Sequence, residues 1–314
     1  MIALTAAQIA EAVSGTLSAT LDPATVLVHV TPDSREVTAE GTLYVAKPGE
    51  RADGHDFIDA ALGAGAAAVL AERATHAPDG AAHPAILVED AVLAMGALAR
   101  EVVRRVREHS PTTVIGITGS AGKTTTKDLL AALLATQGPT VAPVGSYNGE
   151  VGVPLTVFRA ELDTRFLVVE MGADHVGNIA YLCDIVRPDI GVVLMVGTAH
   201  AGSFGGVANI ARTKGELVEA LGPDGVAVLN LDDERVAGMA ARTAAPITWF
   251  TADERGVARA AEDVAASRAS GLVAARDVRA DDQERPVFDL QVGTDEAAVR
   301  HPVASGLTGL HHVH

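Results

Sequence analysis

One stretch, Val114-Ile-Gly-Ile-Thr-Gly-Ser-Ala-Gly-Lys-Thr-Thr-Thr-Lys127, constrains the fold of this chain more than any other. Its first residues, Val114 to Thr118, are apolar or β-branched and predict a buried strand. A glycine-rich turn over 119–124 follows, and the leucines at 129, 130, 133 and 134 predict one apolar face of a helix. A strand, a glycine-rich turn, a Lys-Thr pair and a helix form an arrangement that cradles phosphate groups.

The residue types of this turn indicate how it would hold phosphates. Backbone N–H groups and the helix N-terminus would face the phosphates, Lys123 would reach the outer ones, and the Thr124 hydroxyl can bind Mg²⁺. The turn departs from the common G-x-x-x-x-G-K-[ST] pattern because Ile117 stands five residues before Gly122, and it spells the narrower T-G-S-x-G-K-T. The candidate nucleotide-binding residues of this turn are Gly119, Ser120, Ala121, Gly122, Lys123, Thr124 and Thr125.

Composition narrows the functional classes. With 24 Lys and Arg against 40 Asp and Glu, the formal net charge is −16, which disfavours extended binding to nucleic acid or to an anionic membrane. The single cysteine, Cys183, excludes an internal disulfide framework and suits a reducing compartment. No run approaches the ~20 apolar residues of a membrane span, and the N-terminus lacks the basic start of a signal peptide. We therefore expect a monomeric cytoplasmic protein that neither enters membranes nor binds nucleic acid.

The order of predicted elements indicates an α/β protein with two domains. Residues 1–83 form a small α/β unit, and residues 84–314 form the larger one, with the linker placed somewhere in 74–111. From 112 to about 245 strands alternate with helices, which predicts a mostly parallel sheet with crossover helices. After Pro246 the pattern predicts four short strands at 247–251, 272–278, 287–292 and 298–303 without helices between them, and hence a short antiparallel appendage.

Three predicted strand ends carry polar side chains. Ligands in an open parallel sheet bind beyond the carboxyl ends of the strands. Lys123 and Thr124 follow the first central strand, Glu170 ends the strand 165–170, and His200 follows the strand 190–196. A lysine for phosphate, a carboxylate for Mg²⁺ and an imidazole would thus meet at one edge. Seen alone, Glu170 is as readily a surface carboxylate and His200 a loop histidine.

Other polar positions leave two interpretations open. Lys214, in a predicted amphipathic helix, is either a solvated charge or a group that points back to the metal edge. Asn148 lies in a glycine-rich loop suited to substrate, and the segment 230–233 follows a strand where an amide can read adenine and a carboxylate can hold ribose. The polar loops 33–35 and 49–55 can bind a diphosphate or nucleoside, although such clusters are usually solvated turns.

Several motifs together resemble the Mur ligases in order and spacing. They are Thr118-Gly-Ser-Ala-Gly-Lys-Thr124, Tyr147-Asn-Gly-Glu-Val-Gly-Val-Pro154, Val169-Glu-Met-Gly-Ala173, Gly197-Thr-Ala-His200, Thr213-Lys-Gly-Glu216 and Leu229-Asn-Leu-Asp-Asp233. The resemblance implies a UDP-substrate-binding domain followed by a P-loop-type central ATPase domain. It also implies an ATP- and Mg²⁺-dependent ligase that joins a UDP-N-acetylmuramoyl-tripeptide to D-alanyl-D-alanine through an acyl phosphate, a step of peptidoglycan synthesis.

The resemblance also implies roles for single residues. Lys123 would hold ATP phosphates, Thr124 and Glu170 one Mg²⁺, and His200 a second. Lys214 matches the family lysine that CO₂ converts to a carbamate, which replaces a cation by an anionic oxygen ligand for Mg²⁺. These residues are the catalytic candidates. The other implied contacts are Asn230, Asp232 and Asp233 for adenosine, Ser34, Arg35, Gly49, Arg51, Asp53 and His55 for UDP, and Asn148 for the muramoyl-peptide.

Two features depart from the family pattern. Ser146 and Gly149 stand where the family carries asparagine. A third, Rossmann-like C-terminal domain is not found in the sequence, so the resemblance implies a fragment that binds ligands weakly and does not ligate on its own. The alternatives are another Mur ligase, such as the diaminopimelate- or lysine-adding enzyme, a folylpolyglutamate-synthetase-like ligase, or a non-catalytic nucleotide-binding module.

Overall fold

The computed structural model describes residues 1–37, 40–49, 52–198, 204–266, 269–294 and 298–307. Contacts between Cα atoms divide the chain into two units. One contains Met1–Thr112 and Leu133–Leu167, and the other contains Thr113–Ala132 and Val168–His314. The sequence-based boundary near residue 83 stays a prediction.

The first unit is built on a five-stranded sheet with the order β2-β7-β6-β5-β4. β4, β5, β6 and β7 pair in parallel, and β2 joins β7 antiparallel. The elements of this unit are β1 (Leu4–Thr5), α1 (Ala6–Ala12), β2 (Thr16–Leu17), β3 (Val26–Leu27), β4 (His29–Thr31), η1 (Ser34–Glu36), β5 (Thr42–Ala46), η2 (Gly54–Phe57), α2 (Ile58–Gly63), β6 (Ala66–Ala71), β7 (Ala85–Leu87), α3 (Ala91–His109), β9 (Thr140–Val141) and α5 (Gly152–Val157). Its core includes Tyr44 and Ala46 of β5, Val69 and Ala71 of β6, and Ile58 of α2.

The start of the first unit follows the sequence closely. Thr5 caps α1 with a complete capping box, as its residue type predicts. Residues 26–31 form two short strands: β3 pairs with β1 whereas β4 pairs with β5, so the chain changes partner at Val28. Ser14, at φ 52, takes the left-handed position after α1.

The second unit contains most of a nine-stranded sheet with the order β16-β15-β14-β13-β12-β11-β8-β10-β9. β8, β11, β12, β13 and β14 pair in parallel, whereas β14–β15 and β15–β16 are antiparallel. The further elements are β8 (Thr113–Thr118), α4 (Lys123–Leu134), β10 (Phe166–Glu170), α6 (Asn178–Val186), β11 (Ile190–Val193), α8 (Val207–Glu219), β12 (Val226–Asn230), α9 (Glu234–Ala237), η3 (Gly238–Arg242), β13 (Ile247–Thr251), α10 (Glu254–Ala265), β14 (Gly271–Ala280), β15 (Pro286–Val292) and β16 (Val299–Ala304).

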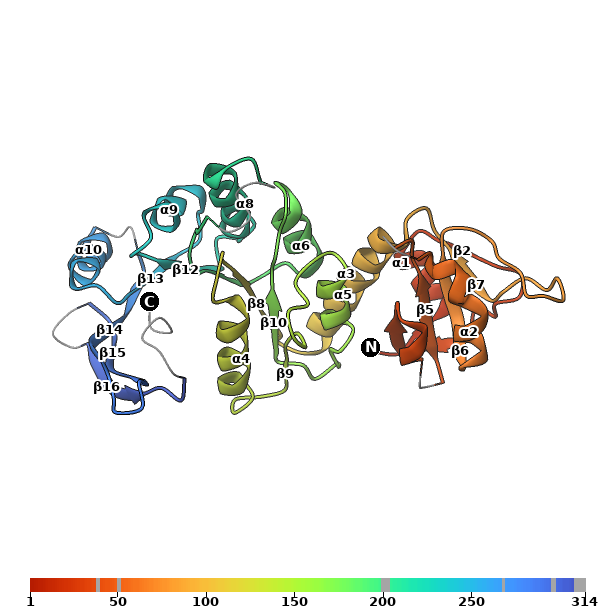
Figure 1. The fold of residues 1–314 in the computed structure, drawn as a ribbon, viewed down its shortest axis with the longest axis horizontal. Helices are drawn as coiled ribbons and strands as arrows, with labels where there is room; N and C mark the ends of the chain where they lie inside the picture. Colours follow the sequence, from red (N-terminus) through yellow and green to blue (C-terminus); the bar gives the residue numbers. More distant parts are fainter. Residues whose placement is uncertain (38–39, 50–51, 199–203, 267–268, 295–297, 308–314) are drawn as a thin grey trace. The chain divides into compact units, whose positions relative to one another are not determined.

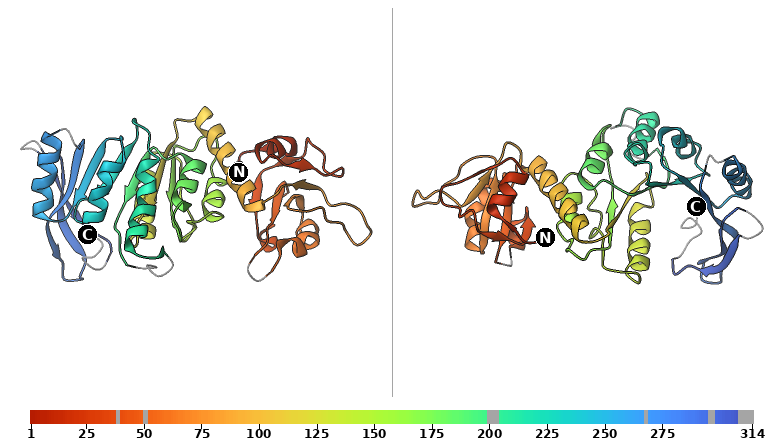
Figure 2. Two further views of the ribbon diagram at one scale, coloured as in Figure 1. Left: turned by 90° about the horizontal axis from the view of Figure 1, so that it is seen from above. Right: turned by 180° about the vertical axis from the view of Figure 1, so that it is seen from behind.

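The antiparallel appendage begins later than the sequence suggested. β13 and β14 continue the parallel sheet, and the crossover helix α10 connects them and lies alongside both strands (Figure 2). Asp253 caps this helix by accepting the N–H of Arg255 at 2.9 Å. The expectation of four strands without an intervening helix is therefore wrong, because the charged stretch after Asp253 was taken for a polar turn. In the described part of the chain, the antiparallel pairing starts where β15 joins β14, and it continues with β16.

Helix α8 packs closely against the middle of the sheet. α6, α8 and α9 lie on one face of the sheet and α4 on the other (Figure 1). Gly116 of β8 and Gly191 of β11 are neighbours in register, and a Cβ on either would meet Leu217 of α8 at 3.0–3.1 Å. The two glycines thus leave space for the buried Leu217 side chain, which fixes α8 over the strand that leads to the phosphate loop.

Helix α4 turns a different face inward than its leucines indicated. Leu129 and Leu133 are exposed by 48% and 68%, whereas Lys127 is buried at 2%. The inward face is centred on 127, 130, 131 and 134. The helix begins at Lys123, directly after the turn, and this start fixes which residues face the sheet.

Candidate functional site

The turn between β8 and α4 has the backbone of a phosphate-binding loop. Gly122 adopts φ +83, which favours glycine, immediately before α4 begins. A Cβ on Gly119 would lie 2.9 Å from Cβ of Leu194, so the turn also passes too close to the end of β11 for a larger residue. The N–H of Ser120 donates to the carbonyl of Met195 at 2.8 Å. The loop is therefore held against its neighbouring strand with the N-terminus of α4 open to a ligand.

Thr124 and Glu170 meet at the carboxyl ends of β8 and β10. The Thr124 hydroxyl donates to Oε2 of Glu170 at 3.0 Å, and Glu170 is only 1% exposed. Lys123 directly precedes Thr124 in the sequence, and its Nζ donates to the carbonyl of Gly119 at 2.9 Å. The Thr124 hydroxyl and the Glu170 carboxylate are hard oxygen ligands of the kind that Mg²⁺ accepts together with water.

Lys214 approaches this site from α8. It is 6% exposed, so the interpretation as a solvated helix charge is wrong. Burial, and to a smaller extent the positive charge of Lys123, lowers the pKa of Lys214 to about 8. The structure thus brings a second lysine near Lys123, and part of its population is the neutral, nucleophilic amine near pH 8.

The expected metal histidine cannot be placed. His200 lies outside the described residues, as does Arg51 of the expected UDP contacts. β11 ends at Val193, earlier than the strand over 190–196 that the sequence indicated. Within the described residues no group of three or more His, Cys, Asp or Glu side chains surrounds a common point.

The polar residues after β12 hold the sheet edge together. Asn230 donates to the carbonyl of Leu194 at 2.8 Å and accepts the N–H of Asp232 at 2.9 Å. The Asp232 carboxylate accepts from the Thr251 hydroxyl and from the N–H of Ala252. These bonds join the ends of β11, β12 and β13. The adenosine role of Asn230 and Asp232 stays a prediction, and a ligand would have to share these atoms.

Asp233 performs two structural tasks at the same edge. Its Oδ1 accepts the N–H groups of Arg235 and Val236 and so caps α9. Its Oδ2 accepts the N–H of Val196 at 2.8 Å, in the segment after β11. One carboxylate therefore positions both a helix start and the segment that leads toward His200.

In the first unit, Asp53 and His55 bond chiefly to the protein itself. His55 Nδ1 lies 2.6 Å from Oδ1 of Asp53, and its Nε2 accepts the N–H of Glu72 at 3.1 Å. Asp53 also binds Arg73 at 2.8 Å, and the hydrogen bonds hold the pKa of the Asp53 carboxyl well below its usual range. The His55 side chain is 1% exposed, and its two ring nitrogens join Asp53 to Glu72.

The loop with Asn148 faces the loop with Ser34 and Arg35 across a small cavity. This cavity of about 390 Å³ lies within the first unit, and its lining includes Asp33, Glu36, Tyr147 and Asn148. Arg35 is 87% exposed at its side chain and binds Asp33, whose pKa it lowers to about 2. At Gly49 the N–H donates to the carbonyl of Ala52, which closes the neighbouring turn. The structure thus brings together two of the three segments expected to meet the UDP-linked substrate.

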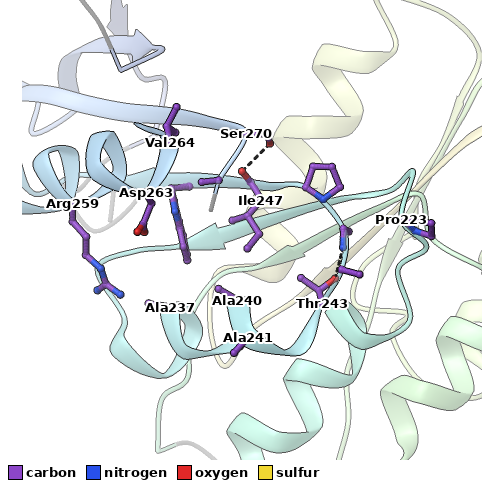
Figure 3. A pocket seen from close by; sticks show the side chains of 15 residues that line it. Pro223, Ala237, Ala240, Ala241, Thr243, Ile247, Arg259, Asp263, Val264 and Ser270 are labelled. Atoms are coloured by element: carbon purple, nitrogen blue, oxygen red, sulfur yellow. Dashed lines mark hydrogen bonds between the residues drawn. The ribbon is translucent and has the colours of Figure 1, made fainter. Parts of the chain in front are cut away.

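A second cavity, of about 830 Å³, lies in the second unit near the amino end of β13 (Figure 3). Alanines of α9 and η3 line one side, and Asp263 and Val264 of α10 line the other. Its floor includes Ile247 at the start of β13 and Trp249, the single tryptophan of the chain, which is 2% exposed. Ligands of open parallel sheets bind at the carboxyl ends of the strands, so this amino-end cavity is separate from the phosphate loop.

Sequence reasoning missed two residues that support the site. Asn178, 7% exposed, accepts the N–H groups of Asp174 and His175 at 3.1 Å and so holds the loop that leaves Glu170. Glu216, two residues after Lys214, is buried against the start of α6. The sequence motif 213–216 contains Glu216 and could have indicated it, but only Lys214 of this motif was assigned a role from the sequence.

The fold and the site define a P-loop-type α/β protein with a nucleotide-binding loop and an adjacent oxygen-ligand pair. The sequence pattern of the Mur ligase middle domain matches residues 117–296, and that of the catalytic domain of the Mur ligase family matches residues 27–102. The chain belongs to the Mur ligase family.

Individual relatives agree with this assignment. The UDP-N-acetylmuramoyl-tripeptide–D-alanyl-D-alanine ligase of Mycobacterium tuberculosis is 43% identical over 100% of this chain and 61% of its own length. That of Escherichia coli is 38% identical over 74% of the chain and 49% of its own length. The chain therefore spans about 61% of the length of the first of these relatives.

Solved structures show the same fold. A crystal structure of MurF from Acinetobacter baumannii superposes with a TM-score of 0.80 at 30% identity, covering 99% of this chain and 62% of that one. MurF ligase from Thermotoga maritima in complex with ADP gives a TM-score of 0.70 at 32% identity, covering 90% of this chain and 58% of that one. Among the described residues, no helix combines the length and apolar character needed to cross a membrane.

Proposed function

We propose that this chain provides the UDP-substrate-binding and ATP-activating parts of a UDP-N-acetylmuramoyl-tripeptide–D-alanyl-D-alanine ligase. The contact of Thr124 with Glu170 beside Lys123 carries the proposal, because it combines phosphate and metal ligands at one sheet edge. The relatives named above and the ADP complex of the Thermotoga maritima protein support it. We extend the proposal to a cytoplasmic monomer with a role in cell-wall growth and cell division.

In the proposed reaction, a carboxylate oxygen of the UDP-linked peptide attacks the γ-phosphorus of ATP, and the bond to the β,γ-bridging oxygen breaks to release ADP. The amine of D-alanyl-D-alanine then attacks the acyl carbon, loses a proton and displaces phosphate. Lys123 and the N–H groups of the loop hold the phosphates, and Thr124 and Glu170 would hold Mg²⁺. When bound, the ion would neutralise phosphate charge during transfer.

Lys214 has the environment that a carbamate requires. The neutral amine can add to CO₂, form an N–C bond and release one proton, which leaves an anion with two oxygens. Burial and the nearby Lys123 favour the neutral amine, and an anion near Lys123 would replace repulsion by attraction. We therefore include carbamylated Lys214 as an Mg²⁺ ligand in the proposal, together with His200 for a second ion.

The first unit would hold the UDP-linked substrate. The cavity of about 390 Å³ between the loops of Asp33 and Asn148 supports this part. Ser34, Arg35 and Gly49 are proposed to face the UDP portion, and Asp53 and His55 to shape the loop behind it. Asn148 is proposed to contact the muramoyl-peptide.

The test is a ligation assay with UDP-N-acetylmuramoyl-tripeptide, D-alanyl-D-alanine, ATP and Mg²⁺, read as product mass and released phosphate. Because the chain spans 61% of the Mycobacterium tuberculosis relative, the assay compares residues 1–314 with the same residues followed by the rest of that relative. We expect product from the extended chain, and nucleotide binding without product from residues 1–314 alone.

Substrate controls separate the alternatives. Product with a UDP-linked dipeptide and a diaminopimelate or lysine acceptor, but not with the tripeptide, would identify a different Mur ligase. Nucleotide binding without product in either form of the chain would favour a non-catalytic module. Glu170→Gln in the extended chain is expected to lower kcat by about 10²-fold or more, because the anionic oxygen ligand is lost.

A further inference from the structure

Two side chains attach helix α8 to its neighbours: Glu216, which is buried, and Arg242, which is partly exposed. α8 lies between α6 and α9 on the face of the larger sheet (Figure 1), and it contacts both helices. Glu216 attaches α8 to the start of α6, and Arg242 of η3 attaches it to the segment after α9. The proposed reaction gives neither residue a chemical task, yet Lys214 lies between their attachment points.

Glu216 satisfies the first turn of α6. Its Oε1 accepts the N–H of Gly177 at 2.7 Å, and its Oε2 accepts the N–H of Ala180 at 3.0 Å. The first N–H groups of a helix have no partner inside the helix and carry partial positive charge, so a buried carboxylate is well matched to them. Gly177 ends the loop that begins directly after Glu170. Glu216 therefore connects α8 to the segment that carries the proposed metal carboxylate.

Arg242 lies across the other side of α8 at Gly215. Its Nη2 donates to the carbonyl of Arg212 at 2.7 Å and its Nη1 to that of Ala211 at 3.2 Å. A Cβ on Gly215 would lie 1.8 Å from Nη1 of Arg242, so a side chain there would displace the guanidinium. Glycine inside a helix ordinarily destabilises it, and here its absence of a side chain makes room for Arg242.

The direction of Lys214 follows from these two attachments. Residues two apart in an α-helix are separated by about 200° around the axis. Because Glu216 points to α6, Lys214 points away from α6, and it lies close enough to Lys123 for the two side chains to interact. A rotation or slide of α8 would move Lys214 relative to the phosphate loop.

We propose that Glu216 and Arg242 are positioning residues that fix the rotation of α8 and so hold Lys214 beside Lys123 at the phosphate loop. The catalytic consequence rests on the proposed function. The positioning itself rests on the four hydrogen bonds to Gly177, Ala180, Ala211 and Arg212.

The test uses Glu216→Gln and Arg242→Lys in the 314-residue chain. Gln can accept only one of the two N–H groups through its single oxygen, and Lys cannot span two carbonyls with a planar fork. The matched controls make the same changes at exposed positions, Glu262→Gln and Arg255→Lys on α10. Gly215→Ala is a third variant, which displaces the guanidinium without changing any charge.

Three measurements are made on the variants. Hydrogen exchange of the Ala180 amide is expected to rise about tenfold in Glu216→Gln, which reports the loss of its acceptor. Labelling of Lys214 by an amine reagent, normalised to Lys47 by mass spectrometry, is expected to rise severalfold in all three variants. The ratio of ADP Kd in EDTA to ADP Kd with Mg²⁺ is expected to fall about threefold or more, and the controls should match the unsubstituted chain.

The outcomes separate positioning from mere stabilisation and from failure of the proposed function. Faster Ala180 exchange with unchanged Lys214 labelling would overturn the proposal, because Glu216 would then only cap α6. A lower midpoint of thermal unfolding with an unchanged Mg²⁺ ratio and unchanged labelling would also overturn it. If the unsubstituted chain shows no Mg²⁺-linked ADP binding, the proposed function fails, and Lys214 labelling alone decides on positioning.

Discussion

At the scale of single residues, the buried ammonium of Lys214 destabilises the folded chain. Burial and the nearby positive charge of Lys123 both favour the neutral amine. The unfolded chain holds the proton up to a pKa near 10.5, whereas the folded chain releases it near 8. Below pH 8 the folded state bears the full cost of the buried charge, and this cost disappears as the pH rises from 8 to 10.5.

Lys214→Met is therefore expected to stabilise the free chain. In CO₂-free buffer at pH 7, the free energy of unfolding should rise by up to about 3 kcal/mol, because a change of one pKa unit corresponds to ~1.4 kcal/mol. The advantage of the variant should shrink as the pH is raised through the window between 8 and 10.5. Urea unfolding at several pH values measures this, with Lys47→Met as the control. A variant less stable than the parent at pH 7 would contradict the lowered pKa.

The geometry predicted from the sequence was confirmed where a local motif fixes it. The turn over 119–124 and the meeting of Thr124 with a carboxylate followed from strand and helix order. The internal bonds of Asn230 and Asp232 were not predictable, because Leu194 follows β11 and Thr251 ends β13, and the sequence does not state the register of these strands.

At the scale of elements, the central helices differ in how much they depend on the sheet. α8 inserts Leu217 against a pair of glycines, whereas α4 leaves Leu129 and Leu133 exposed. The sequence predicted an apolar face on both helices, from the leucines of α4 and from the amphipathic pattern of α8. It cannot show which helix has a neighbour that covers that face.

Truncation of two leucines should distinguish these helices. Leu217→Ala is expected to lower the free energy of unfolding by about 2–5 kcal/mol, because it leaves a cavity over Gly116 and Gly191. Leu133→Ala, at 68% exposure, is expected to change it by less than about 0.5 kcal/mol. Chemical unfolding of both variants makes the comparison, and equal losses would show that α4 is covered in solution.

Elements with weak local signals account for the errors of sequence-based prediction. α10 was missed because its residues are mostly charged or alanine, and its burial is limited to positions such as Gly256 and Ala260. The short helix α5 was taken for a loop because Pro154 and Gly152 usually mark turns. In both cases the packing partner, which the sequence does not reveal, decides the structure.

At the scale of the whole molecule, the chain has two units that would serve two kinds of ligand. The phosphate loop lies in the second unit, and the cavity beside Asn148 lies in the first. The sequence predicted two domains and their α/β class, whereas the grouping of Leu133–Leu167 with the first unit depends on long-range contacts.

Ligands should protect the two units separately. ADP with Mg²⁺ at 100 times its Kd is expected to stabilise the second unit by about 2.7 kcal/mol. Its protection against hydrogen exchange should be concentrated in β8, β10, α4 and α8. A UDP-linked muramoyl substrate should instead protect β4, η1 and the residues near Asn148. Equal protection of both units by ADP alone would contradict this division.

Trp249 can serve as an intrinsic fluorescence probe of the second unit. The chain has one tryptophan, and it lies on β13 in the second unit at 2% exposure. Emission excited at the red edge of the protein absorption band therefore reports the melting of that unit alone, while circular dichroism sums both. A gap between the two melting curves would measure directly how far the units unfold independently.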